Sequence, residues 1–101
     1  MRYKAIIQSI RNINTIDAEI DLGFKVKVNA TLILKNISSL LKNNDRLDDA
    51  IKYLETLVGK SVSIDIRLAK NHSLAIIYLN GENVNQCLLD KGLAKKFIKK
   101  E

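Results

Sequence analysis

The sequence predicts a single α+β domain built on a five-stranded β-barrel, and three observations lead to that class. Five segments carry strand signals, and three of them show the alternation of apolar and polar residues that is typical of half-buried strands. One segment with helical spacing separates the third strand from the fourth, and a second follows the fifth. The chain has 101 residues, a length that suits one domain. We therefore expect residues 1–101 to form one domain, with a basic tail at residues 94–101.

The first three strands are predicted to form a meander. Residues 3–13 are rich in isoleucine, and residues 15–22 alternate apolar side chains with Asp17, Glu19 and Asp21. Gly23 supplies a turn because glycine adopts positive φ without steric cost. Residues 24–34 then resume the alternation. This pattern places one set of side chains inside the barrel: Phe24, Val26, Val28, Ala30, Leu32 and Leu34.

A helix is predicted between the third and fourth strands. Residues 45–58 carry apolar side chains at the spacing of one helix face. Asn44 or Asp45 is suited to cap its first turn, and Gly59 to end it. A helix in this position gives the chain the element order of an OB-fold.

Two more strands and a second helix complete the domain. Residues 61–68 alternate as a strand does, and the apolar run 74–79 is predicted to be the fifth strand, with Tyr78 as a core residue. The Asn80-Gly81 pair is a strong turn signal. Asn83 can then cap a helix that covers residues 84–90, and Gly92 can end it in the left-handed conformation.

Composition and charge restrict the class of protein further. No apolar run approaches the roughly 20 residues of a membrane helix, and the first ten residues lack the features of a signal peptide. A single cysteine, Cys87, excludes an internal disulfide and a multi-cysteine metal site. We expect a cytoplasmic protein. The net charge is +6, and the basic excess of residues 61–101 is concentrated in lysines near the C-terminus. Such lysines can contact phosphates but more often only keep a terminus solvated.

Two runs of the sequence resemble the staphylococcal nuclease family. Residues 15–24, TIDAEIDLGF, are similar to that family's second strand and hairpin. Residues 74–86, LAIIYLNGENVNQ, followed by KGLA at 91–94, resemble its pattern of strand, Asn-Gly turn, short helix and Gly-Leu-Ala. The resemblance covers nearly the whole chain. It implies a five-stranded OB-type barrel, and active members of the family cleave DNA and RNA with Ca²⁺.

The resemblance also implies where catalytic groups would lie, and this chain lacks their charges. Asn14 stands where the family has a metal-binding carboxylate, and Thr31 where it has an arginine. Asn36 replaces a second metal ligand, Ser39 the catalytic glutamate, and His72 a second arginine. Ca²⁺ prefers charged oxygen ligands, and arginine stabilises the charge that develops on phosphate. We therefore expect no nuclease activity, no metal and no cofactor.

Other chemistry finds little support in the residues. His72 and Cys87 are the only histidine and cysteine, and the resemblance puts them in a turn and a helix, so we do not expect them to meet. Asp45, Asp48 and Asp49 suit the N-terminal end of a helix better than a calcium loop. No phosphate-binding loop, zinc pattern or nucleophile triad occurs.

Two classes of function remain, and both are binding. A protein-docking module is favoured, and its size and Asn-rich, Lys-rich composition would also fit a viral accessory protein that modulates a host factor in the host cytoplasm. Recognition concentrates on loops that a rigid scaffold holds. The candidate interaction loop consists of Asn36, Ser38, Ser39, Leu40, Leu41 and Asn43.

The alternative class is nucleic-acid binding without catalysis. An OB barrel and a basic C-terminus both suit it, although the chain has few aromatic side chains on which bases could stack. The candidate contact residues are Tyr3, Arg67, Lys70, Lys95, Lys96, Lys99 and Lys100. A residual phosphodiesterase is the least favoured possibility.

Overall fold

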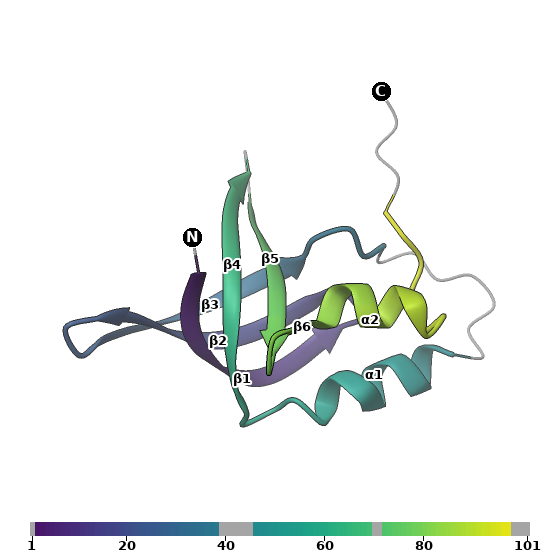
Figure 1. Ribbon diagram of the computed structural model, residues 1–101, viewed down its shortest axis with the longest axis horizontal. Helices are drawn as coiled ribbons and strands as arrows, with labels where there is room; N and C mark the ends of the chain where they lie inside the picture. Colours follow the sequence, from purple (N-terminus) through teal and green to yellow (C-terminus); the bar gives the residue numbers. More distant parts are fainter. Residues whose placement is uncertain (1, 39–45, 70–71, 98–101) are drawn as a thin grey trace.

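The structure, a computed structural model, describes residues 2–38, 46–69 and 72–97. It contains six strands and two helices in an order that runs from strands through a helix back to strands (Figure 1). The strands are β1 (Arg2–Asn12), β2 (Thr15–Gly23), β3 (Val26–Leu34), β4 (Ser61–Ala69), β5 (His72–Leu79) and β6 (Glu82–Asn83). The helices are α1 (Leu47–Glu55), between β3 and β4, and α2 (Val84–Asp90), after β6.

Five of the strands close into a mixed barrel. The sheet order is β3-β2-β1-β4-β5-β6, and β3 also pairs with β5. The β3–β5 pairing is parallel and short, with Ile33 opposite Leu74 and Leu34 opposite Ala75. The other pairings are antiparallel. The predicted five-stranded barrel is thus confirmed, in a form that is compatible with an OB-fold; β6 is a short extra strand that the sequence did not predict.

The long strand β1 lets the sheet curve. It pairs with β4 through Arg2–Ile6 and with β2 through Lys4–Asn12. Its register against β2 shifts between Ile7 and Ser9 and again between Ile10 and Asn12. Such irregularities bend a strand and increase its twist, and one strand can therefore serve two neighbours around the barrel.

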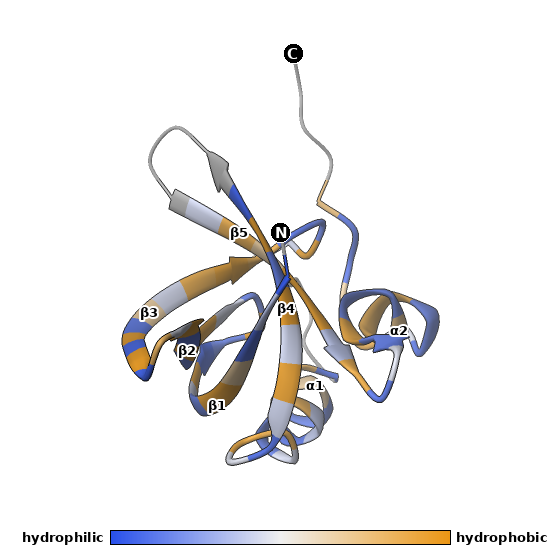
Figure 2. Ribbon diagram, turned by 60° about the vertical axis from the view of Figure 1, so that its left-hand side comes forward, coloured by the Kyte–Doolittle hydropathy of each residue, from blue (hydrophilic) through white to orange (hydrophobic). Residues whose placement is uncertain are grey.

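The core lies inside the barrel and under the helices. The alternation predicted for β2 holds there: Ile16, Ala18 and Ile20 are buried, whereas their polar neighbours face outward. Figure 2 shows how apolar and polar residues alternate along the strands. Ala50 and Leu54 of α1 and Val84 and Leu88 of α2 are buried as well.

One buried polar side chain completes the closure of the barrel. Asn85 of α2 is 4% exposed. Its Oδ1 accepts a hydrogen bond from the N–H of Ile77 at 3.1 Å, and its Nδ2 donates to the carbonyl oxygens of Lys35 and Ala75, both at 3.0 Å. The N–H of Lys35 also donates to Ala75 at 2.9 Å. The side chain therefore joins the end of β3 to β5 just where the ladder between them stops.

The predicted inward face of the third strand is wrong at its first half. Phe24 is fully exposed, Val26 is 49% exposed and Val28 is 39% exposed, whereas Leu32 and Leu34 are buried as expected. The reason is geometric: the hairpin of β2 and β3 is longer than the barrel. Its tip projects on the side opposite the helices (Figure 1), where no other strand faces it among the described residues.

Three local predictions met different outcomes. Helix α1 is shorter than the predicted 45–58; Arg46 precedes it without a side-chain cap, and the predicted caps Asn44 and Asp45 lie outside the described residues. Asn83 caps α2, accepting a hydrogen bond from the N–H of Gln86 at 3.0 Å. Tyr78, expected in the core, is instead half-buried on the outer face.

Neither helix within the described ranges has the length and hydropathy to span a membrane.

Candidate functional site

The turn between β1 and β2 holds the first of the positions that the resemblance singled out. The N–H of Asn14 donates to Asn12 Oδ1 at 2.9 Å, which is an Asx-turn. The hydroxyl of Thr15 donates to Asn14 Oδ1 at 3.0 Å, and Asn14 Nδ2 donates to the carbonyl oxygen of Ile37 at 3.3 Å. Both ends of the Asn14 amide are therefore engaged within the protein, and they tie this turn to the segment after β3.

That segment, residues 36–38, is joined to the basic tail. Asn36 has φ of 69°, in the left-handed region that asparagine tolerates, and its carbonyl oxygen accepts from the N–H of Phe97 at 2.8 Å. The N–H of Ser38 donates to Lys95 at 2.9 Å, and Ile37 forms an antiparallel bridge with Lys96. The structure thus brings Asn36 and Ser38 of the predicted interaction loop beside Lys95 and Lys96 of the basic tail. The side chains of both lysines are exposed.

A third predicted position, Thr31, belongs to a different cluster on the outer face of the barrel. Its hydroxyl donates to Asp17 at 2.6 Å. Ser9 donates to the same carboxylate at 2.7 Å and Arg11 Nε at 2.9 Å. The hydrogen bonds from Thr31, Ser9 and Arg11 lower the pKa of Asp17 to about 2. These neighbours keep the carboxylate ionised. We interpret the cluster as a set of side-chain hydrogen bonds that links β1, β2 and β3.

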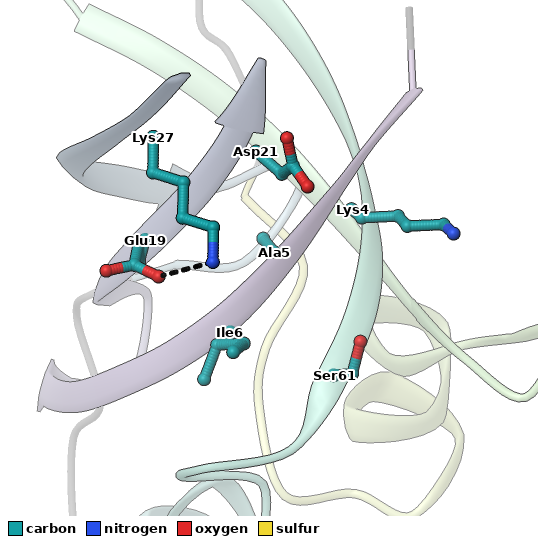
Figure 3. Close-up of a pocket in the computed structure, with 7 residues that line it drawn as sticks. All are labelled: Lys4, Ala5, Ile6, Glu19, Asp21, Lys27 and Ser61. Atoms are coloured by element: carbon teal, nitrogen blue, oxygen red, sulfur yellow. Dashed lines mark ion pairs between the residues drawn. The ribbon is translucent and has the colours of Figure 1, made fainter. Parts of the chain in front are cut away.

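The same outer face carries a second group of charges at its other end. Asp21 lies between Lys4 of β1 and Lys27 of β3 in the sheet register. Figure 3 shows these residues around a shallow pocket, with the Lys27 ammonium directed at Glu19 over 3.9 Å. Since acidic and basic groups alternate from strand to strand, this face offers no continuous basic surface to a phosphate backbone.

The candidates for nucleic-acid contact are dispersed. Tyr3 is half-buried and packs against the core. Arg67 is exposed on the outer face of β4, in register with Leu74 of β5. Arg2 lies over the ring of Tyr78, with its guanidinium carbon 4.0 Å from the ring centre. Arg2, Lys4 and Arg67 form the basic outer patch of β1, β4 and β5, and Asp65 lies within it, opposite Arg2.

The remaining predicted residues are described in part or not at all. His72 is placed only by its backbone, which pairs with Ala69 where β4 and β5 meet. Seven others lie outside the described residues: Ser39, Leu40, Leu41, Asn43, Lys70, Lys99 and Lys100. Within the described ranges, no group of three or more His, Cys, Asp or Glu side chains is placed to hold a metal ion.

An apolar surface that sequence reasoning missed lies at the end of the β2–β3 hairpin. The tip of the β2–β3 hairpin, hereafter the hairpin tip, exposes Leu22, Phe24, Val26 and Val28. Phe24 and Lys25 both have positive φ, 52° and 62°, which is the geometry of a two-residue type I′ turn. Asn and Gly are the residues that such a turn favours. The sequence did contain a signal for this surface, because a bulky aromatic residue at a position of this turn that favours Asn or Gly has no local structural reason.

No family model and no curated protein matches the chain. What the structure establishes is the closed five-stranded barrel.

Proposed function

We propose that this domain is a non-catalytic binding module, of the nuclease-like OB type, that docks a protein partner through the hairpin tip. The observation that carries the proposal is the full exposure of Phe24 between the exposed Leu22 and Val26. Contiguous exposed apolar side chains typically mark interaction sites. Aromatic residues are also the usual anchors of protein interfaces.

The backbone at the hairpin tip supports the same proposal. A non-glycine residue at positive φ is uncommon, and for a bulky side chain it carries strain. Phe24 combines this strain with exposure of its ring. Neither property stabilises the isolated domain. A partner that buries the ring would gain the hydrophobic free energy that the exposed ring does not contribute to folding.

The polar groups at the nuclease-like positions support binding over catalysis. The Asn14 amide and the Thr31 hydroxyl are occupied by hydrogen bonds inside the protein. The backbone around Asn36 is occupied by residues 95–97. A hydrolytic site would need such groups to face a substrate and a cation.

Site-specific photo-crosslinking in the cells that make the protein tests the proposal. A benzophenone amino acid replaces Phe24 in one variant and Phe97, which is 57% exposed, in a matched control. We expect position 24 to form adducts with another protein, and excess wild-type domain to suppress them where the Phe24→Ser domain does not. Adducts confined to position 97 would move the docking site to residues 36–38 and the tail. Absence of protein adducts at both positions would contradict protein docking.

Nucleic-acid binding is a second candidate, and the basic outer patch of Arg2, Lys4 and Arg67 favours it. Arginine and an aromatic ring together can contact a phosphate and a base. The test is a titration of labelled single- and double-stranded DNA and RNA at two salt concentrations, with Ca²⁺, Mg²⁺ or Mn²⁺ present. Binding through this patch requires salt sensitivity and loss on Arg67→Ala. Strands cut in the process would overturn the non-catalytic proposal.

A further inference from the structure

The strand β3 has one edge that the barrel leaves open. On one side it pairs with β2 from Val26 to Ile33. On the other side only Ile33 and Leu34 pair with β5. Within the described residues, the stretch from Val26 to Leu32 therefore has no strand partner on that side. Long open edges are uncommon in folded proteins because they accept additional strands.

The register identifies the backbone groups that face this edge. The N–H of Leu34 donates to Asn14 on the β2 side at 2.7 Å, whereas the N–H of Lys35 donates to Ala75 on the β5 side. Backbone groups of successive residues in a strand point to opposite edges. The β2–β3 register is regular from Thr15 to Asp21. The N–H and C=O groups of Lys27, Asn29 and Thr31 therefore face the open edge.

The side chains beside the edge define what would fit it. One face of β3 carries the exposed Val26 and Val28. The other face carries Lys27, Asn29 and Thr31, all exposed. A strand added here would place its alternate side chains against these two faces. It needs apolar residues next to the valines and an acidic residue next to Lys27.

The molecule already shows the kind of strand that β3 accepts. On its occupied edge lies β2, which alternates buried apolar residues with Asp17, Glu19 and Asp21. Lys27 is opposite Asp21 in the register and forms an ion pair with Glu19 at 3.9 Å. A net charge of +6 favours acidic over basic partners generally. Lys27 is the one charged side chain among Lys27, Asn29 and Thr31, so an added strand would share it with Glu19 and would be favoured by an acidic residue at that position.

We infer that the open edge of β3 binds an extended segment of a partner protein, with alternating apolar and acidic side chains, by strand addition. The inference rests on the proposed protein docking and specifies its mode. Backbone hydrogen bonds to Lys27, Asn29 and Thr31 hold the segment, and the valines and Lys27 select its side chains. Phe24, at the end of the same strand pair, packs on the apolar face of the added strand.

A peptide with the sequence of residues 15–23 is the probe, because it has the required alternation of apolar and acidic side chains and the same sequence, as β2, already pairs with the other edge of β3. The control peptide carries lysine at the three acidic positions. Fluorescence anisotropy should show saturable binding of the acidic peptide and binding weaker by about tenfold or more for the control. Amide hydrogen exchange should slow at Lys27, Asn29 and Thr31 when the acidic peptide is bound.

A matched pair of variants separates backbone from side-chain effects. Asn29→Pro removes an edge-facing N–H, and proline is tolerated where that group is not part of the existing ladder. Asn29→Ala removes the side chain but keeps the N–H. We expect only the proline variant to lose the peptide, again by about tenfold or more. Should the proline variant fail to fold, the peptide pair and the exchange data on the unmodified protein decide.

Three results would overturn the inference. The first is no difference between the two peptides, or no binding of either at millimolar concentration. The second is binding with protection at other amides. The third is a dimer of the protein alone in sedimentation, with these three amides protected, since a second copy would then occupy the edge. Each of these results is compatible with crosslinks from position 24 to another protein. Failure of strand addition is therefore distinguishable from failure of protein docking.

Discussion

The side-chain amide of Asn85 donates a hydrogen bond to the carbonyl oxygen of Lys35 over 3.0 Å, across fifty positions of sequence. The same amide bonds the backbone of Ala75 and Ile77. The parallel ladder between β3 and β5 has only two residue pairs, so this side chain supplies much of the remaining link. The asparagine in the Val-Asn pair that starts α2 thereby has a structural role.

Replacing Asn85 should destabilise the domain strongly. Asn85→Ala leaves the buried N–H of Ile77 without its acceptor, and a buried unsatisfied group costs about 1–3 kcal/mol. We expect the free energy of unfolding to fall by about 2–3 kcal/mol in urea titrations. The exposed neighbour Gln86→Ala should change it by no more than about 0.5 kcal/mol. Equal effects of the two substitutions would contradict the role assigned to Asn85.

Redesign of the hairpin turn should stabilise the domain. Phe24 and Lys25 both have positive φ, and Asn-Gly is the favoured pair for this turn type. Phe24→Asn with Lys25→Gly should raise the free energy of unfolding by about 1 kcal/mol, measured by urea titration. In excess, the same double variant should fail to suppress the crosslinks formed from position 24, because stability and function are often in conflict at binding sites. A drop in stability would mean that the Phe24 ring already packs within the domain.

Asp17 should make stability depend on acid pH. Its pKa lies at about 2 in the folded protein against an ordinary 3.8, chiefly through the hydrogen bond from Thr31. A lowered pKa stabilises the folded state above about pH 4, and this contribution is lost as pH falls towards 2. Asp17→Asn should therefore unfold at lower urea than wild type at pH 7, and the gap should narrow at pH 2. A gap between the two proteins that is constant with pH would contradict this assignment.

Restoring a carboxylate at position 14 should destabilise the protein. In Asn14→Asp the group that donates to Ile37 becomes an oxygen, which faces the carbonyl oxygen now 3.3 Å from Nδ2. We expect a loss of about 1–2 kcal/mol at pH 7. Protonation returns a donor, so the difference from wild type should shrink at pH 3. Unchanged stability at both pH values would show that this hydrogen bond contributes nothing measurable.

The sequence predicted much of the local structure because local patterns are fixed by nearby residues. Alternation in residues 15–22 marked β2 and its buried face, since neighbouring side chains in a strand point to opposite sides. Asn83 predicted the start of α2, because an N-cap requires only its own side chain and the backbone N–H of the residue three positions later. The glycines at 23, 59, 81 and 92 all have positive φ, as short-range turn chemistry indicated.

The surfaces could not be predicted in the same way, because exposure depends on what faces a strand. Val28 and Leu32 follow the same alternation in β3, yet Val28 is exposed and Leu32 is buried. Only the length of the hairpin relative to the barrel separates them. Likewise, nothing near Thr31 in the sequence indicates that its hydroxyl donates a hydrogen bond to Asp17, fourteen residues away.

By itself, then, the sequence determined the five strands of the barrel, the cap of α2, the glycine turns, and the burial of Ile16, Ala18 and Ile20 in β2. The tertiary structure decided which apolar residues remain outside, which edge of β3 stays open, and how residues 36–38 meet the tail. The division has a physical cause. Backbone preferences and side-chain periodicity act over a few residues, whereas burial and strand pairing are set by segments that meet only when the barrel closes.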